Sequence, residues 1–275
     1  MFQMKNYKIL ISGLLLLLVA ACGDYNKVLQ STDTEYKYKK AVDYYKTKEY
    51  AKAIGLFTDL VRIYRGTSKA DDIYYYFAKS HMGQRDYLMA GHFFKNLVKE
   101  YPRSDYAEES QYMIGYCFYL DSPKPRLDQT TSQQAIDALQ FFINIYPSSS
   151  RVEEARRIID ELKDKLVYKS YLSGKLYFDL GQYKAAVISL NNSLKEYPQT
   201  KYREELSFML LEAKYRLGIN SVEEKRVERL NMALDEYFAF ADEFPKSKYI
   251  KTANKYYKTL AKTLNYKEEV EEKNN

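Results

Sequence analysis

The chain has 275 residues, and 43 Lys and Arg against 37 Asp and Glu give it a formal net charge of +6. Basic and acidic residues are interleaved throughout, which indicates a solvated surface and argues against the concentrated basic patch of a nucleic-acid-binding protein. The chain also carries 30 Tyr and 13 Phe but no Trp, and its 10 Gly and 6 Pro favour an all-helical array over a β-rich fold.

The first 21 residues have the pattern of a bacterial export signal. Lys5 and Lys8 form a charged start, and the apolar run over residues 9–21 is too short to span a bilayer. Small residues immediately before Cys22 resemble a lipobox, in which the cysteine thiol receives a diacylglyceryl group and the freed amine a further acyl chain. Cys22 is therefore the expected lipidation site, through which the mature chain would be anchored in a lipid bilayer. The alternative is an ordinary cleaved signal with a cysteine nearby by chance.

Five related stretches mark places where one helix ends and the next begins. They are Tyr64-Arg65-Gly66-Thr67, Tyr101-Pro102-Arg103-Ser104, Tyr146-Pro147-Ser148-Ser149, Tyr197-Pro198-Gln199-Thr200 and Phe244-Pro245-Lys246-Ser247. Proline prevents the outgoing helix from continuing, and the Ser or Thr hydroxyl can accept a bond from a free backbone N–H of the next helix. Acidic residues that follow, such as Glu108 and Glu109, suit the positive end of the helix dipole.

Small residues recur at regular distances before each of these stretches. The second helix of each pair carries Ala53, Ala90, Ala135, Ala186 or Ala233, and the first helix carries Ala41, Ala78, Gly115, Gly174 or Ala213. Small side chains at both places allow two antiparallel helices to approach closely. This order of small, aromatic and proline positions resembles tetratricopeptide (TPR) repeats and predicts an all-α fold, an α-solenoid of about five helix hairpins.

The repeats are interrupted after Pro147, where apolar residues continue at three- and four-residue spacing. This pattern predicts one long helix from about Arg151 to Asp179, which would join two blocks of repeats. The expected organisation is a signal peptide over residues 1–21, a tether over 22–34, a first TPR block over 35–150, the long helix and a second TPR block over 151–264, and a frayed charged tail over 265–275.

The residues that usually carry catalysis or bind metals are sparse. His81 and His92 are the two histidines, and no cysteine or acid cluster accompanies them at ligand spacing. Cys117 lies among aromatic residues, which indicates a buried, unreactive thiol. No phosphate-binding glycine loop or hydrolase motif is present. We therefore expect a protein that is not an enzyme and has no cofactor, no metal and no nucleic-acid partner.

Tyrosines occupy one register position in four successive repeats. Tyr38, Tyr75, Tyr112 and Tyr171 each precede the small residue of the first helix by three. In TPR proteins this place faces the concave groove, and the same register adds Tyr45, Lys79, Met82, Tyr116, Tyr119, Lys175 and Phe178. Such a surface suits an extended peptide, although the rings could instead fill the space between adjacent repeats. In the second block the corresponding face carries Lys175, Leu210 and Lys214, which suits a folded, charged neighbour.

Beyond the repeat, the chain resembles the BamD family, the TPR lipoproteins of the outer-membrane β-barrel assembly machinery. The resemblance is carried by Cys22 followed by Tyr25-Asn26-Lys27-Val28-Leu29, by Tyr50 with Ala53 and Phe57, by Tyr101-Pro102-Arg103-Ser104, by the turn from Ser122-Pro123 to Leu127-Asp128-Gln129, and by Phe142 with Tyr146-Pro147. It implies five TPRs, a lipid-anchored position on the outer membrane facing the periplasm, and no enzymatic activity. It also implies two partners, the periplasmic domains of the barrel-forming insertase and unfolded outer-membrane proteins. Arg65-Gly66 replaces the proline in the first repeat and departs from the pattern.

Two other classes of outer-membrane lipoprotein are alternatives. One is a SusD-like glycan-binding protein, but such proteins are about twice as long and use Trp heavily for sugar stacking. The other is a TPR protein that coordinates envelope processes. Pull-downs from the cell envelope would distinguish the three.

Overall fold

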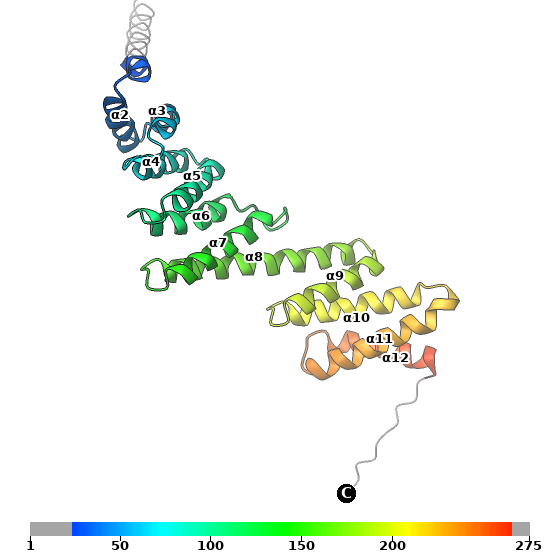
Figure 1. The fold of residues 1–275 in the computed structure, drawn as a ribbon. Helices are drawn as coiled ribbons and strands as arrows, with labels where there is room; N and C mark the ends of the chain where they lie inside the picture. The colour runs from blue at the N-terminus through cyan, green and yellow to red at the C-terminus, as the bar shows by residue number, and fades with distance from the viewer. Residues whose placement is uncertain (1–23, 266–275) are drawn as a thin grey trace, which may run out of the picture. The chain divides into compact units, whose positions relative to one another are not determined.

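The computed structural model describes residues 24–265, and every regular element in that range is an α-helix (Figure 1). The helices are α2 Thr34–Lys46, α3 Tyr50–Ile63, α4 Ala70–Gly83, α5 Tyr87–Glu100, α6 Ala107–Asp121, α7 Thr130–Ile145, α8 Val152–Asp179, α9 Tyr183–Glu196, α10 Arg203–Ile219, α11 Glu223–Glu243 and α12 Ile250–Leu264. Successive helices pack against one another from α2 to α7 and from α9 to α12, as expected for helix hairpins stacked in sequence order. The predicted all-α repeat fold is confirmed.

The chain divides into two compact units. One unit extends to Lys124 and includes Asp128–Leu162, and the other consists of Pro125–Leu127 and the chain from Lys163 onward. The predicted long helix is present as α8, whose 28 residues correspond to about 42 Å at 1.5 Å per residue. Its first part belongs to the first unit and its remainder to the second.

The alanines of the second helices lie where the helix pairs meet most closely. Ala53, Ala90, Ala135, Ala186 and Ala233 all have 0% exposed surface. On the partner helix, a Cβ added to Gly115 would lie 2.6 Å from Cγ of Leu139. A Cβ added to Gly174 would lie at the same distance from Cδ2 of Leu190. The close approach predicted from the small residues is therefore confirmed.

The five hydroxyl residues shape the start of each following helix. The hydroxyl oxygen accepts a hydrogen bond from the backbone N–H two residues on, at 2.9–3.4 Å, in all five cases: Thr67, Ser104, Ser149, Thr200 and Ser247. The helix itself begins one residue later. The predicted role of these hydroxyls as backbone acceptors is confirmed, and each turn also fixes the residue that receives the bond.

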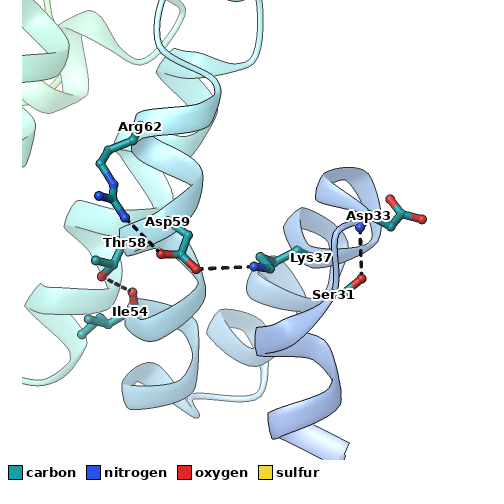
Figure 2. Close-up of polar contacts among 7 residues, drawn as sticks. All are labelled: Ser31, Asp33, Lys37, Ile54, Thr58, Asp59 and Arg62. Atoms are coloured by element: carbon teal, nitrogen blue, oxygen red, sulfur yellow. Dashed lines mark hydrogen bonds and ion pairs between the residues drawn. The ribbon is translucent and has the colours of Figure 1, made fainter.

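A buried lysine joins the two helices of the first repeat. Figure 2 shows Asp59 of α3 between Lys37 of α2 and Arg62, with an oxygen 3.4 Å from a nitrogen of each. The Lys37 side chain is only 7% exposed. A buried ammonium group is costly without a counter-charge, so Asp59 compensates the charge of Lys37 inside this hairpin.

The segment before α2 also contributes to the core. Residues 24–30 are helical, and Val28 is buried at 3% exposure against residues of α2 and α3. The expected tether over residues 22–34 therefore carries a part that packs onto the first repeat. Cys22 and the signal sequence lie outside the described residues, as does the charged tail from residue 266. Within residues 24–265, no helix is both long and apolar enough to cross a membrane.

Candidate partner-binding face

The register tyrosines donate hydrogen bonds from one repeat to the next. The Tyr38 hydroxyl bonds Oδ2 of Asp72 at 3.2 Å, and the Tyr75 hydroxyl bonds Oε2 of Glu109 at 2.9 Å. In the second unit the Tyr171 hydroxyl bonds Oε1 of Glu205 at 3.0 Å. Donor and acceptor are 34 residues apart in each case. This interval is the length of one standard TPR, so each bond joins equivalent first helices of neighbouring repeats.

A second side chain covers the ring of each register tyrosine. It belongs to the residue two positions after the hydroxyl residue, whose backbone N–H bonds that hydroxyl. Tyr106 stacks on Tyr75 with ring centroids 4.2 Å apart, and Tyr202 stacks on Tyr171 at 4.4 Å. A cation takes the same place in two repeats, Lys69 over Tyr38 at 5.5 Å and Arg151 over Tyr112 at 5.0 Å. These contacts add ring stacking or cation–π attraction to each repeat interface.

Tyr112 is the most enclosed of the register tyrosines. Its side chain is 2% exposed, and its ring contacts Tyr116 and Phe142 at 5.6 and 5.5 Å between centroids. Burial, followed by the nearby Glu154 carboxylate, raises the pKa of Tyr112. At this position the ring fills the space between repeats, and its surface is not available to a partner.

The remaining predicted tyrosines of the first unit are more accessible. Tyr45 is half-buried against Tyr76, with centroids 5.3 Å apart. Tyr116 is half-buried between Tyr112 and Tyr119. The Tyr119 hydroxyl donates to the Glu161 carboxylate at 3.0–3.1 Å. We refer to Tyr38, Tyr45, Tyr75, Tyr112, Tyr116 and Tyr119 as the tyrosine face.

Glu109 is a shared acceptor on this face. It receives the Tyr75 hydroxyl at 2.9 Å and the Lys79 ammonium at 3.3 Å, and Arg151 lies 3.6 Å away. Two cations therefore offset one carboxylate here, with Lys79 and Arg151 23% and 38% exposed.

Burial and the carboxylates keep these phenols neutral. Burial, with the bonded carboxylate as a further cause, raises the pKa of Tyr38 and Tyr75 and raises the pKa of Tyr171 to about 12. A phenol hydroxyl that donates a hydrogen bond to a carboxylate still has lone pairs on its oxygen. The oriented hydroxyls of Tyr38 and Tyr75 can therefore accept hydrogen bonds from a partner's N–H groups, but they have no second proton to donate.

The second unit presents a different set of groups. Lys175 pairs with Asp179 at 3.2 Å and is 40% exposed. Lys214 pairs with Glu236 at 2.5 Å, and both side chains are mostly buried, at 14% and 16% exposure. Lys214 therefore compensates the Glu236 carboxylate between α10 and α11, whereas Lys175 remains accessible.

Leu210 does not occupy the face on which the sequence placed it. It is 2% exposed and packs with residues of α9, while Phe208 stacks on Tyr249 with centroids 4.4 Å apart. Phe208 follows Thr200 by eight residues, as Tyr75 follows Thr67 and Tyr112 follows Ser104. The predicted register of this repeat depends on the distance from Ala213 to Pro245, and α11, with 21 residues, is longer than the second helices of the other repeats, which shifts that register. Counting forward from the hydroxyl finds the correct residue.

The side chains that contact the tyrosines were not predicted from the sequence. The acceptors Asp72, Glu109 and Glu205 each follow the hydroxyl residue by five positions, as does Glu154 near Tyr112. Lys69, Tyr106, Arg151, Tyr202 and Tyr249 each follow it by two. This regularity was a usable signal. Acids at this place favour a helix start, and Asp72, Glu109 and Glu205 also accept hydrogen bonds from the preceding repeat.

The other titratable candidates form no site. Within residues 24–265, no group of three or more His, Cys, Asp or Glu residues is arranged to hold a metal ion. Burial raises the pKa of Cys117 to about 12, so its thiol is protonated and unreactive. His81 contacts Asp86 through Nδ1 at 3.0 Å, and His92 contacts Asn96 through Nε2 at the same distance.

Three relatives resemble the chain over different lengths. The outer membrane protein assembly factor BamD of Caulobacter vibrioides is 27% identical over 51% of this chain and 50% of its own length. A BamD homologue from Aquifex aeolicus is 26% identical over 72% of this chain and 66% of its own length. BamD of Neisseria meningitidis is 24% identical over 89% of this chain and 94% of its own length. The chain thus spans half the length of the first relative and about two thirds of the second.

A solved structure and a family model also match. The TPR2AB domain of yeast Sti1 covers 83% of this chain and 98% of its own length, with 13% identity and a TM-score of 0.37. The family model described as YfiO, outer membrane lipoprotein, matches residues 30–230. Because this match spans most of the sequence, the chain belongs to the YfiO family of outer membrane lipoproteins.

Proposed function

We propose that this protein is a non-enzymatic scaffold of the outer-membrane β-barrel assembly machinery. Anchored through acylated Cys22 and facing the periplasm, it binds the periplasmic domains of the insertase and unfolded outer-membrane proteins. The observation that carries this proposal is the family match over residues 30–230, together with relatives that are named outer membrane protein assembly factors.

The tyrosine face is the part of the first unit that suits an unfolded substrate. Barrel strands alternate apolar and polar side chains, and an extended segment exposes its backbone N–H groups. The oriented hydroxyls of Tyr38 and Tyr75 would accept from such N–H groups, while the half-buried rings of Tyr45 and Tyr116 would contact its apolar side chains. Lys79 and Arg151 would favour segments that carry a carboxylate.

The second unit suits a folded, charged neighbour. Lys175 is an accessible cation of this unit, and Leu176 beside it is 56% exposed. A polar rim next to an exposed apolar residue is typical of the edge of a protein–protein interface. We therefore assign the insertase to the second unit and the substrate to the first.

The experiment has two arms. Depletion of the protein should lower the amount of folded barrel proteins in the outer membrane, measured by heat-modifiable gel mobility. Photoreactive residues at positions 79 and 116 should capture unfolded barrel proteins, and those at positions 175 and 176 should capture the insertase. Unchanged barrel assembly after depletion would exclude the assembly function. Capture of one and the same partner at all four positions would exclude only the division between the units.

Substitution tests the role of the rings. Tyr116→Ala should lower substrate capture at position 79 several-fold, whereas Tyr177→Ala, at a tyrosine 38% exposed in the second unit, should leave it unchanged. Thermal melts of both variants would show whether any loss comes from unfolding. Equal capture in the two variants would remove Tyr116 from the proposed site.

A further inference from the structure

A groove runs between the second helices of repeats two and three, with α6 as its floor. Ile114 and Phe118 of α6 form the floor, Leu88 and Val98 of α5 one wall, and Ala138 and Phe141 of α7 the other. The groove encloses about 660 Å³, and all three helices belong to the first unit. We refer to it as the α5–α7 groove.

The groove is on the side of α6 away from the tyrosine face. Tyr112, Tyr116 and Tyr119 follow one another at i, i+4 and i+7, which places them on one side of the helix. Ile114 and Phe118 are two residues away from Tyr112 and Tyr116, which at 100° per residue turns them roughly to the opposite side. A ligand in the groove would therefore not compete with one on the tyrosine face.

Two wall residues expose large apolar side chains to solvent. Leu88 is 71% exposed and Phe141 is 53% exposed. The other four repeats provide an internal comparison. At the position of Leu88 they have Ala51, Gln133, Lys184 and Asn231. At the position of Phe141 they have Asp59, Asn96, Asn192 and Ala239. The repeat fold therefore does not require a large apolar residue at either place. Exposed apolar side chains that line one groove from two helices, without a structural role, indicate a contact surface.

The charges around the groove differ between its two edges. His92, Lys95 and Lys99 line the α5 side at i, i+3 and i+7, and among the described residues no ion pair joins either lysine to a carboxylate. On the α7 side, Asp137 accepts a hydrogen bond of 2.9 Å from Nε2 of Gln133. The α5 edge is thus cationic and uncompensated, and it would attract a ligand with an acidic side.

A ligand on the apolar floor must also have hydrogen-bond partners for its own backbone N–H and C=O groups. All three helices bond their backbone groups internally, so the groove offers no strand edge to an extended peptide. An extended chain would bury unpaired N–H groups against Ile114 and Phe118, which is costly. A helix has no such cost, because its backbone bonds are internal, and an amphipathic helix can place a row of apolar side chains on the floor.

We propose that the α5–α7 groove binds an amphipathic helix of a partner protein, with apolar residues at helical spacing on the floor and Asp or Glu along the α5 edge. This surface goes beyond the substrate and insertase contacts proposed above. It would let the scaffold hold a third protein while the tyrosine face is occupied.

Site-specific photocrosslinking in cells that make the full-length protein tests this proposal. A photoreactive residue replaces Leu88 or Phe141, and the matched controls place it at positions 51 and 192, the equivalent places in the first and fourth repeats. We expect adducts from positions 88 and 141 and none from the controls. Mass spectrometry of the crosslinked peptide should identify a segment of another protein with apolar residues at i, i+3 or i+4 and i+7 and acidic residues on one side.

Charge reversal provides the second arm. K95E combined with K99E should lower the adduct yield about tenfold, because two attractive charges become repulsive. K251E combined with K255E, a pair of exposed lysines with the same spacing on α12, should leave the yield unchanged. The proposal is overturned by the absence of adducts, by equal yields from the control positions, or by yields that do not respond to charge. Adducts with lipid, with a second copy of this chain or with its own residues 266–275 would likewise overturn it.

Discussion

The hydroxyl of Tyr75 on α4 donates to Oε2 of Glu109 on α6 at 2.9 Å, and this bond joins two consecutive repeats. The same relationship recurs between Tyr38 and Asp72 and between Tyr171 and Glu205. TPR arrays gain stability from each repeat and from each interface between neighbours. The three tyrosines therefore contribute to the stability of the interfaces between repeats.

Removal of the Tyr75 hydroxyl should weaken this interface. Tyr75→Phe keeps the ring stacked on Tyr106 but removes a bond to a charged acceptor, so we expect the free energy of unfolding to fall by about 1–2 kcal/mol. Glu109 remains compensated by Lys79, which limits the loss. Tyr36→Phe, at a tyrosine 44% exposed, is the control and should change little. Urea unfolding of both variants measures the difference, and equal stabilities would show that the bond contributes nothing.

Two glycines in neighbouring helices should respond in opposite directions to the same substitution. A Cβ at Gly115 would lie 2.6 Å from Cγ and 3.0 Å from the backbone N of Leu139, so Gly115→Ala should destabilise the protein by roughly 1–3 kcal/mol. A Cβ at Gly91 would lie 3.5 Å from Cβ of Cys117, an ordinary contact. Gly91→Ala should therefore stabilise the protein by up to about 1 kcal/mol through helix propensity. Thermal melts decide the matter, and a stabilising Gly115→Ala would contradict the close contact.

The contribution of Tyr171 should depend on alkaline pH. Burial and the bond to Glu205 raise its pKa from about 10 to about 12, so the folded state binds this proton more tightly than the unfolded state. The resulting stability is fully present below about pH 10 and is lost as the pH rises toward 12. The difference in unfolding free energy between wild type and Tyr171→Phe should therefore shrink over this range. Urea unfolding at a series of pH values tests it, and a difference independent of pH would show that the phenol is not perturbed.

Membrane attachment should depend on Cys22. Because the described fold begins at residue 24, Cys22→Ala should leave the thermal melt unchanged but release the protein from membranes. Fractionation after a high-salt wash, which removes electrostatic contacts with partners, measures the release. A Cys22→Ala protein that still sediments with outer membranes would contradict the acyl anchor.

The features that the sequence determined by itself depend on residues close together in the chain. Apolar residues at helical spacing predicted α8 from about Arg151 to Asp179, and the structure has it over Val152–Asp179. The hydroxyl residues predicted the helix boundaries, because the bond to a nearby N–H needs only a local turn. The small residues predicted helix pairs, because only small side chains permit close approach.

The contacts between repeats were decided only by the tertiary structure. Whether Tyr75 faces a groove or a neighbouring carboxylate depends on how two helices pack, and Glu109 is 34 residues away. The placement of Phe208 in the position assigned to Leu210 follows from the length of α11, which shifts any register counted across it. The α5–α7 groove likewise depends on tertiary packing, because Leu88 and Phe141, 53 residues apart in the chain, line it from two different helices. Helix periodicity determines which residues share a face of a helix. The crossing angle of the helices and the length of the loops determine which neighbouring helix that face contacts.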